Sequence, residues 1–582
     1  MNSFLKIFLA SLVALIVFTI AAFFILVGMA GSLASSEKPT VGNKAILVVD
    51  LADEYPEITE EDPISELSSG DNGKPALYDL IRLIRHAKSD SAVKGIYLRC
   101  GSNANGFASG ESIREALADF KSANKFVIGY GDVISQGGYR VGNVANKLYC
   151  NPMGGVDWKG YATQLMFLKG TLEKLDIQPQ IFYAGKFKSA TEPFRETKMT
   201  DANRQQTTEL IGSLYAHLLV QTAEARKIDT ATLHRYANES LIQTGHDALK
   251  YGLVDGLKYD DEVKDEIKQR VGSGKYDKIN FITVGKYMKA VEYKLSGKNK
   301  IAVIFAQGDI IDGKGERSSI GSESYRALVR KARLDKDIKA IVFRINSGGG
   351  SALASENIWR ELTLAKADKP VIVSFGDVAA SGGYYLACNA DSIFAERNTI
   401  TGSIGVFTLI PNMQGFFNKK LGVTFDGVKT SPDADAMTVA KPLTEPQKRF
   451  IQNDIDTTYH NFKSRVAQGR KLTIEYVDSI GQGRVWIGSK AVELGLVDKI
   501  GGLDDAIACA ARMAKITDYR LREYPDKRSF LDMILGSKEQ APQAAIRQEL
   551  GADGYRIYQT IKRTKSMTGV TQARMPFELV IE

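Results

Sequence analysis

Apolar residues are concentrated at the start of the chain. Residues 7–29 read IFLASLVALIVFTIAAFFILVGM and contain no charged side chain. At about 1.5 Å of rise per residue, a helix of this length reaches about 34 Å, enough to cross the roughly 30 Å hydrocarbon core of a bilayer. We therefore expect a cytoplasmic N-terminus over 1–6, a transmembrane anchor over 7–29 and a linker over 30–43. Removal of the apolar run as a signal peptide, near Ala34–Ser35, is the alternative.

The rest of the chain alternates strand-like and helix-like patterns. Short runs rich in β-branched residues lie at 301–310, 340–345 and 371–375, and glycine or polar turn residues end them. Between them, apolar residues recur at helical spacing over 322–335 and 352–366. Alternation of this kind is typical of an α/β domain with a parallel sheet.

This pattern occurs twice. GDVISQGGY at 131–139 recurs as GDVAASGGY at 376–384, an offset of 245 residues, and without any gap 96–139 matches 341–384 at 13 of 44 positions. Self-similarity over this length indicates a duplicated domain. The predicted organisation is an N-terminal copy over 44–260, a connector over 261–298, a C-terminal copy over 299–517 and a C-terminal tail over 518–582.

Composition excludes several classes of function. Lysine and arginine number 76 against 68 aspartate and glutamate, a net charge of +8 without any long basic run, so we expect no nucleic-acid partner. The four cysteines are scattered and form no CxxC pair, which predicts neither a zinc site nor a disulfide framework. No metal and no cofactor is expected.

The two copies differ inside otherwise matching motifs. Ser381 of the C-terminal copy faces Gln136 of the N-terminal copy, and NSGGGS at 346–351 becomes GSNANG at 101–106. A serine that follows a strand and precedes two glycines lies where a helix begins, so the N–H of Gly382 can point at an anion beside the hydroxyl. The glycine run can supply a second donor, which predicts an oxyanion hole in one copy only.

A serine nucleophile needs a base. The C-terminal copy contains a single histidine, His460, in a charged helical stretch, which disfavours a Ser-His-Asp triad. A lysine can act as base once burial moves its pKa from about 10.4 toward about 7–8. The pattern alone does not tell which lysine is buried. The glycine run lacks the GK[ST] ending of a P-loop, which disfavours nucleotide binding.

Several motifs resemble one family, the long form of the membrane-bound signal peptide peptidase A, also called protease IV. They are YAGKFKSATEPF at 183–194, INSGGGS at 345–351, GDVAASGGYYLAC at 376–388, TGSIGV at 401–406 and GLVD in both copies. That family is similar in fold to crotonase and to the Clp protease subunit, and it uses a Ser/Lys dyad. The resemblance implies tandem α/β domains of the crotonase/Clp-protease type after one N-terminal transmembrane helix.

The resemblance also implies roles for individual residues. They are Ser381 as nucleophile, Lys188 as general base, Ser403 as the hydroxyl that orients the lysine, and Gly349 or Gly350 with Gly382 as oxyanion hole. Alignment of GKFKSA with GVKTSP places Thr430 opposite Lys188, so each copy would supply half of the dyad. Lys186, two residues away, is the rival base. Gly348 stands where the family usually has proline, which loosens the loop.

The leading hypothesis is a serine endopeptidase in the bacterial inner (cytoplasmic) membrane, single-pass, with its body on the periplasmic side. It would degrade cleaved signal peptides, and also misfolded exported proteins, through an acyl-enzyme. The resemblance implies a homotetramer, and the dyad forms either within one chain or between neighbours. A crotonase-like acyl-CoA enzyme and a non-catalytic scaffold are the alternatives, because a fold does not fix a function.

Overall fold

The computed structural model describes residues 7–8, 10–21, 39–58, 75–316, 318–526, 558, 567 and 569–575. Within the expected anchor, residues 7–8 and 10–21 are helical, and the other residues of the anchor lie outside the described part of the chain. Among the described residues, no helix combines the length and the apolar character needed to cross a membrane.

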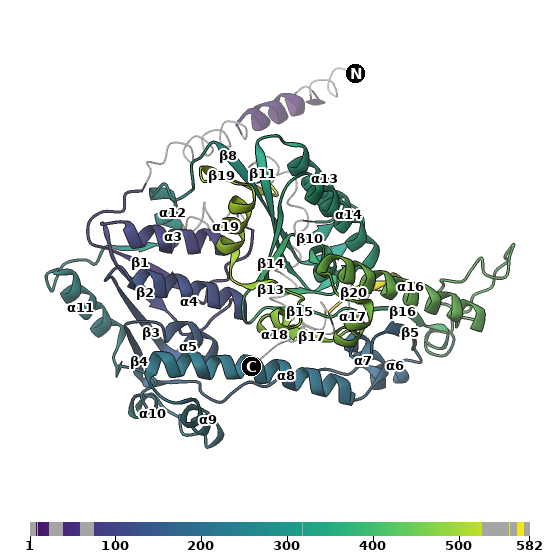
Figure 1. The fold of residues 1–582 in the computed structure, drawn as a ribbon, viewed down its shortest axis with the longest axis horizontal. Helices are drawn as coiled ribbons and strands as arrows, with labels where there is room; N and C mark the ends of the chain where they lie inside the picture. Colours follow the sequence, from purple (N-terminus) through teal and green to yellow (C-terminus); the bar gives the residue numbers. More distant parts are fainter. Residues whose placement is uncertain are drawn as a thin grey trace.

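The N-terminal copy is built on a parallel sheet of six strands in the order β6-β4-β3-β2-β1-β7 (Figure 1). The strands are β1 (Ala45–Asp50), β2 (Val93–Arg99), β3 (Phe126–Ile134), β4 (Lys147–Val156), β6 (Gly256–Leu257) and β7 (Phe281–Thr283). The helices are α3 (Leu77–Ser89), α4 (Phe107–Lys121), α5 (Gln136–Gly142), α8 (Asp201–Arg226), α9 (Thr230–Asn238), α10 (Gly245–Lys250), α11 (Asp260–Val271) and α12 (Val284–Ala290). Separate apolar clusters cover the two faces of the sheet, and in one of them Val263 and Ile267 of α11 pack against residues of the strands.

The C-terminal copy repeats this arrangement. Its main sheet runs β17-β15-β13-β11-β8-β19, and β14 joins β13 to β18. The strands are β8 (Asn299–Gln307), β11 (Ile338–Ser347), β13 (Val371–Ala380), β14 (Ser392–Ala395), β15 (Ile400–Gly402), β17 (Val485–Ile487), β18 (Lys499–Ile500) and β19 (Tyr519–Tyr524). The helices are α13 (Ser322–Leu334), α14 (Ala352–Asp368), α15 (Gly382–Ala387), α16 (Glu445–Arg470), α17 (Ile474–Ile480), α18 (Gly488–Glu493) and α19 (Leu503–Met513).

The strand order confirms the duplication. The series β7-β1-β2-β3-β4-β6 of the first copy corresponds to β19-β8-β11-β13-β14-β18 of the second. Each series includes one strand from a segment that we expected to lie outside the copy, because β7 belongs to the expected connector 261–298 and β19 to the expected tail 518–582. β7 has only three residues and leaves little local pattern, whereas β19 has six and is placed by its pairing with β8, more than 200 residues earlier in the chain.

A third sheet combines both copies and the tail, in the order β10-β9-β12-β20-β16-β5. Its strands are β5 (Gln178–Ala184), β9 (Asp309–Ile311), β10 (Ser319–Gly321), β12 (Gly349–Ser351), β16 (Val406–Asn412) and β20 (Gln572–Arg574). β5 belongs to the N-terminal copy and pairs antiparallel with β16 of the C-terminal copy. This sheet therefore brings residues of the N-terminal copy beside the C-terminal copy.

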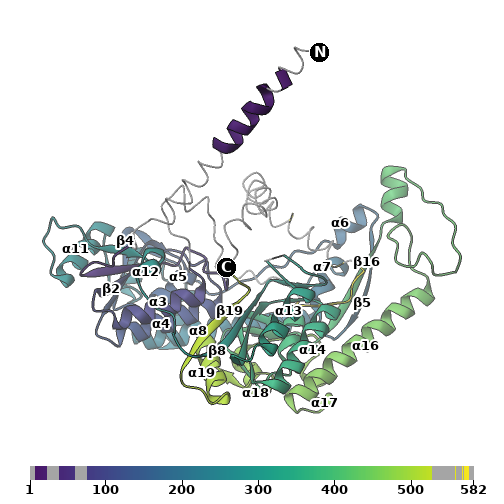
Figure 2. The same cartoon turned by 90° about the horizontal axis from the view of Figure 1, so that it is seen from above.

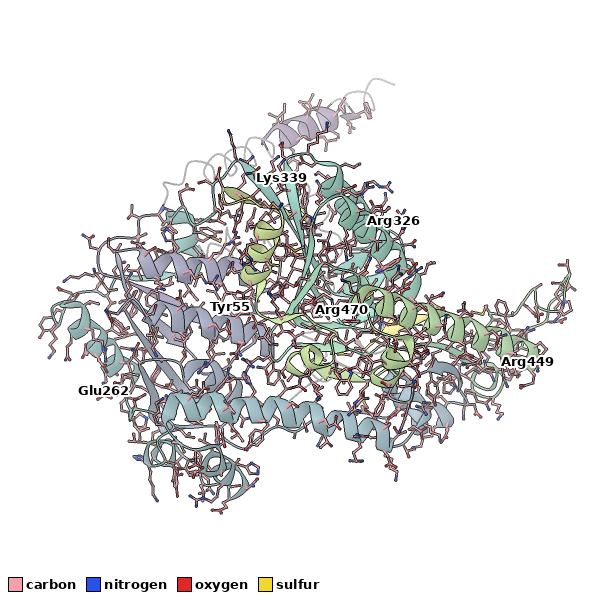
Figure 3. The ribbon with its side chains drawn as sticks, in the orientation of Figure 1. Tyr55, Glu262, Arg326, Lys339, Arg449 and Arg470 are labelled. Atoms are coloured by element: carbon pink, nitrogen blue, oxygen red, sulfur yellow. The ribbon has the colours of Figure 1, made fainter. Side chains whose placement is uncertain are left out.

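Helix α8 and α16 run along the outside of the molecule (Figures 1 and 2). Leu210 and Leu214 of α8 pack in one cluster with Val485 of the C-terminal copy, whereas Leu218 packs in the core of the N-terminal copy. In α16, Arg449 and Arg470 mark opposite ends of the helix (Figure 3). Helix α8 therefore ties the two copies together through apolar contacts.

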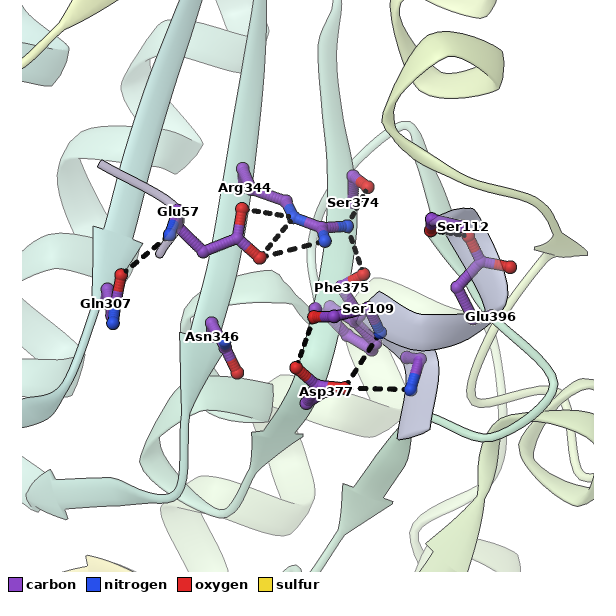
Figure 4. Close-up of polar contacts among 12 residues, drawn as sticks. Glu57, Ser109, Ser112, Gln307, Arg344, Asn346, Ser374, Phe375, Asp377 and Glu396 are labelled. Atoms are coloured by element: carbon purple, nitrogen blue, oxygen red, sulfur yellow. Dashed lines mark hydrogen bonds and ion pairs between the residues drawn. The ribbon is translucent and has the colours of Figure 1, made fainter. Parts of the chain in front are cut away.

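Buried polar contacts also join the copies (Figure 4). The carboxylate of Asp377 on β13 accepts hydrogen bonds from the backbone N–H groups of Ala108 (2.8 Å) and Ser109 (2.9 Å), in the first turn of α4. Arg344 of β11 forms an ion pair with Glu57, at 2.9 Å between Nη2 and Oε1. The helix that follows β2 is thus capped by a carboxylate of the other copy, four residues before Ser381.

Candidate active site

Ser381 lies at the junction of β13 and α15. Its side chain is fully buried, and its backbone adopts φ 55° and ψ −115°. A positive φ at a residue other than glycine costs about 1–3 kcal/mol and persists only where the surroundings enforce it. Here the Ser381 N–H donates to the carbonyl of Gly402 (2.8 Å), and its carbonyl accepts from Tyr385 N–H (2.8 Å). These contacts hold the hydroxyl where the helix begins.

Lys188 follows β5 and reaches Ser381 from the N-terminal copy. Its Nζ lies 2.9 Å from the Ser381 Oγ, and the side chain is only 1% exposed. The loop that carries Lys188 packs closely against the C-terminal copy. A methyl group added at Gly483 would lie 2.6 Å from the backbone nitrogen of Lys188. Burial alone holds the pKa of the Lys188 amine well below its usual range.

Ser403 completes the set of contacts to the lysine. The Lys188 Nζ lies 3.0 Å from the Ser403 Oγ and donates to the Ser403 carbonyl at 3.2 Å. Ser403 also has a positive φ, 52°, and its N–H donates to the Arg484 carbonyl (2.7 Å). The structure thus brings together Ser381, Lys188 and Ser403, and it does so within one chain.

The three predicted oxyanion glycines are buried next to the hydroxyl. Gly349 has φ 97°, a conformation that residues with a Cβ rarely adopt, and a methyl group there would lie 2.7 Å from the Gly382 nitrogen. Gly350 follows in β12, and a methyl group there would lie 2.0 Å from the Ile310 carbonyl oxygen. The space around the serine is therefore lined by backbone, as an oxyanion hole requires.

Other residues that we weighed as candidates lie elsewhere. The rival base Lys186 is exposed, and its Nζ lies 5.5 Å from the centre of the Phe187 ring. Thr430 is exposed in the long excursion between β16 and α16, which covers residues 413–444. The His460 Nε2 lies 3.4 Å from the hydroxyl of Ser464, on the same helix. Gln136 is buried but bonds the backbone of Lys159 and Gly160 in its own copy.

Strand β20, which lies across this site, was not expected from the pattern of residues. β20 pairs antiparallel with β12, and Ala573 faces Gly350. Asp309, at the start of β9, contacts Arg574 of the same strand at 2.9 Å. A three-residue strand far along the chain has no periodicity to reveal it. Within the described ranges, no three His, Cys, Asp or Glu side chains gather to hold a metal ion.

The chain is similar to known proteases over most of its length. It is 37% identical over 488 residues to "Protease 4" of Salmonella typhi, covering 82% of this chain and 78% of that one. It is 33% identical over 517 residues to "Protease 4" of Haemophilus influenzae, covering 84% and 83%. A shorter relative, "Putative signal peptide peptidase SppA" of Enterococcus faecium, is 34% identical over 247 residues, covering 41% of this chain and 72% of that one.

A solved structure of a mutant ClpP1 from Listeria monocytogenes overlaps 35% of this chain and 94% of its own, at 15% identity and a TM-score of 0.25, which is too low to argue from. The model of the family described as "Peptidase family S49" matches twice, at residues 119–273 and 363–517, once in each copy. These matches and the similarity to the proteases confirm the resemblance seen in the sequence. The chain belongs to peptidase family S49 and is a serine peptidase.

Proposed function

We propose that this chain is a serine endopeptidase whose catalytic dyad is Ser381 and Lys188. One observation carries the proposal: a fully buried serine hydroxyl lies 2.9 Å from the amine of a buried lysine whose pKa is lowered by burial. A neutral amine has a lone pair and can accept the serine proton, whereas a solvated ammonium cannot.

The mechanism is acyl transfer. Ser381 Oγ attacks the carbonyl carbon of the substrate while its proton moves to the Lys188 Nζ. The negative charge on the carbonyl oxygen is stabilised by the N–H of Gly382 and by an N–H of the glycine run at 349–350. The lysine then gives the proton to the leaving amine, and water hydrolyses the ester by the same route in reverse. The contacts of Ser403 keep the amine aimed at the hydroxyl.

We propose cleaved signal peptides as substrates, with misfolded exported proteins as a second class. The apolar run over 7–29 supports an anchor in the bacterial inner membrane, with the body on the periplasmic side. Signal peptides are released into that membrane, so an anchored enzyme is close to them. The E. faecium relative bears the name of such an enzyme.

We also propose a homotetramer that encloses its sites. In support, the excursion between β16 and α16, which projects from the body (Figure 2), exposes apolar side chains, among them Leu421, Phe425 and Val428. Patches of this kind often mark contacts between subunits. The native mass of the full chain in detergent tests this: we expect four chains of 63.8 kDa each, and a monomer contradicts it.

Hydrolysis of small peptide esters and amides tests the dyad. We expect Ser381→Ala and Lys188→Ala each to lower kcat/KM at least about 10³-fold, because each removes one half of a unit that acts together. Lys186→Ala is the matched control, since it deletes an exposed lysine two residues away, and we expect full activity. Retained activity in either dyad variant excludes the dyad. Turnover of an acyl-CoA by the native chain would instead favour a crotonase-like enzyme.

A further inference from the structure

Strand β20 fills a place in the sheet where an extended peptide fits. It pairs antiparallel with β12 on one side and with β16 on the other. The sheet order is β9-β12-β20-β16-β5, so β12 and β16 face each other across this strand. Two facing strand edges bind a peptide by main-chain hydrogen bonds. β20 therefore occupies the position that a peptide substrate needs in order to reach the serine.

The register places one peptide bond at the reacting atoms. Gly350 faces Ala573. The pairs two positions away on either side are hydrogen-bonded. In one, Met575 N–H donates to the Gly348 carbonyl (2.6 Å), and in the other, Ala352 N–H donates to the Thr571 carbonyl (3.0 Å). Hydrogen-bonded pairs alternate along an antiparallel ladder, so Gly350 and Ala573 form the hydrogen-bonded pair between them. The Gly350 N–H thus points at the carbonyl oxygen of Ala573.

The same oxygen lies against the other two predicted oxyanion glycines. A methyl group added at Gly349 would lie 2.1 Å from the Ala573 carbonyl oxygen, and one added at Gly382 would lie 2.9 Å from it. A substrate presents the carbonyl of the residue before the cut to these donors. Ala573 is therefore in the position of that residue, and Arg574 is the first residue after the cut.

The side chains on either side of this bond have fitted surroundings. Ala573 is fully buried in the core of the C-terminal copy, which leaves room for a small side chain only. The Arg574 Nη1 donates to the Oδ2 of Asp309 at 2.9 Å, and its side chain is 4% exposed. Met575 packs in the apolar cluster that contains Leu210 of α8.

The residues before the cut are held as well. The Thr571 hydroxyl donates to the Oδ2 of Asp454 at 2.9 Å and lies 3.2 Å from the hydroxyl of Thr408 on β16. The N–H of Gly569 donates to the carbonyl of Leu409 at 3.1 Å. Contacts along the whole stretch, rather than one chance contact, hold it in the groove.

We propose that residues 569–575 are a substrate of this site, cut between Ala573 and Arg574, and that Asp309 selects a basic residue directly after the cut. The proposal rests on the proposed function of Ser381 and Lys188. It adds a substrate pattern, a small residue before the cut and a basic residue after it, and a residue that reads the second position. Until it is cut, the segment competes with other peptides for the groove.

The proposed step needs only water. The Ser381 oxygen bonds to the Ala573 carbonyl carbon, the bond from that carbon to the Arg574 nitrogen breaks, and the serine proton reaches that nitrogen through the Lys188 amine. Water then attacks the ester, restores the serine hydroxyl and leaves Ala573 with a free carboxylate. The peptide that begins with Arg574 leaves as an amine.

The mass of the purified full chain tests the cut. We expect the native chain to end at Ala573 and Ser381→Ala to keep its C-terminus. Arg574→Glu places two carboxylates together at Asp309 and should slow the loss of the C-terminus at least about tenfold, whereas Arg574→Lys keeps the positive charge and should be cut. A native chain that keeps residues beyond 573, while it still hydrolyses added peptides, overturns the proposal and leaves the proposed function standing.

Added peptides test the role of Asp309 separately. The native chain should cut a peptide containing Thr-Gln-Ala-Arg-Met at least about tenfold faster, in kcat/KM, than one containing Thr-Gln-Ala-Glu-Met. Asp309→Arg should reverse this preference, because the charge that faces the residue after the cut changes sign. Equal rates for both peptides with the native chain overturn the selection by Asp309. Hydrolysis of no peptide at all contradicts the proposed function instead.

Discussion

The two copies share one topology but differ in what fills the space around the helix that follows the third strand of each. Three positions carry the difference, each pairing a large side chain of the N-terminal copy with a small residue of the C-terminal copy: Gln136 with Ser381, Asn105 with Gly350, and Trp158 with Ser403. The small residues surround the candidate dyad, and the large ones close the corresponding space.

Each large side chain bonds the backbone of its own copy. The Gln136 Nε2 donates to the carbonyl of Gly160 (3.0 Å), and the Asn105 Oδ1 accepts from the N–H of Tyr55 (2.9 Å), whose side chain packs in the core of the N-terminal copy. The Trp158 Nε1 donates to the carbonyl of Leu233 (2.9 Å). Buried polar groups are normally hydrogen-bonded, so these three side chains fill the space in the N-terminal copy without leaving a polar group unpaired.

The backbone at the start of the helix that follows the third strand also differs between the copies. In the N-terminal copy, Ser135 caps α5 with φ −64° and its hydroxyl accepts from the N–H of Gly138, as an ordinary helix start requires. In the C-terminal copy, Ser381 caps α15 with φ 55° and forms no such bond. Of these two helix-capping serines, only Ser381, whose hydroxyl faces a lysine, has a strained backbone, and strain of this kind is a usual mark of a functional site.

The largest expected effect comes from an attempt to move the site into the other copy. We expect the triple variant Ser381→Ala, Gln136→Ser, Thr430→Lys to show at least a 10³-fold lower kcat/KM than the native chain, with peptide esters as substrate. A lysine at 430 is on the exposed excursion, and Asn105 and Trp158 still fill the space around residue 136. Activity near that of the native chain would mean that the copies are interchangeable. Gln136→Ser alone, with Ser381 intact, is the control and should keep full activity.

The glycine run should show the next largest effect. Gly350→Ala puts a methyl group 2.0 Å from a carbonyl oxygen, so the loop must move, and we expect kcat/KM to fall about 10²–10³-fold. Gly348→Ala is the matched control, because its methyl group would meet only the Cβ of Met575 at 3.6 Å, an ordinary contact. Its expected loss is less than about threefold. Equal losses in both variants would show that the loop as a whole, not its N–H donors, matters.

Much of the fold could be predicted because it repeats. The run at 340–345 is the central part of β11 and the run at 371–375 is the first half of β13. The offset of the two copies located Ser381 by its mismatch with Gln136. Both signals, the spacing of apolar residues along the chain and the match between the copies, can be read from the sequence without knowledge of its contacts.

The rest depends on contacts between distant residues. Lys186 and Lys188 have the same local pattern, and only the approach of Gly483 and the contacts of Ser403 bury one of them. β20 pairs over more than 150 residues of sequence, between Gln572 and Phe407, so no window along the chain includes both strands. Resemblance to a family supplied the lysine, and nothing in the sequence supplied Asp309.

The pH dependence of activity should separate the buried lysine from every exposed one. Because burial lowers the pKa of Lys188, the amine is neutral and active at high pH and protonated at low pH. We expect kcat/KM to fall about tenfold per pH unit below that pKa, as a single ionisation. In Lys188→Arg the side chain remains charged at every pH, so kcat/KM should stay low and should not rise at high pH. A profile in the native chain that is flat from pH 5 to 10 contradicts a lysine base.

The smallest expected effect concerns the joint between the copies. Glu396 of the C-terminal copy accepts a hydrogen bond from the Ser112 hydroxyl of α4 at 2.7 Å (Figure 4), and burial, with Glu115 nearby, raises the pKa of Glu396 from 4.5 to about 7. The folded chain therefore binds this proton more tightly than the unfolded chain. The contribution to the free energy of unfolding is complete below pH 4.5 and is lost as pH rises toward 7, by about 1–3 kcal/mol.

Glu396→Gln removes this ionisation and keeps an oxygen for the Ser112 hydroxyl. At pH 8 the variant should be more stable than the native chain, by about 1–3 kcal/mol, whereas at pH 4.5 the two should be nearly equal. Denaturant unfolding at both pH values measures the difference. Glu111 and Arg344 also shift the pKa of this carboxyl. Ser112→Ala serves as the control, because it removes the hydrogen bond to Glu396 and leaves those two charges in place. A variant that is less stable at pH 8 would show that the ionised carboxylate holds the copies together, and the joint would then weaken on acidification instead.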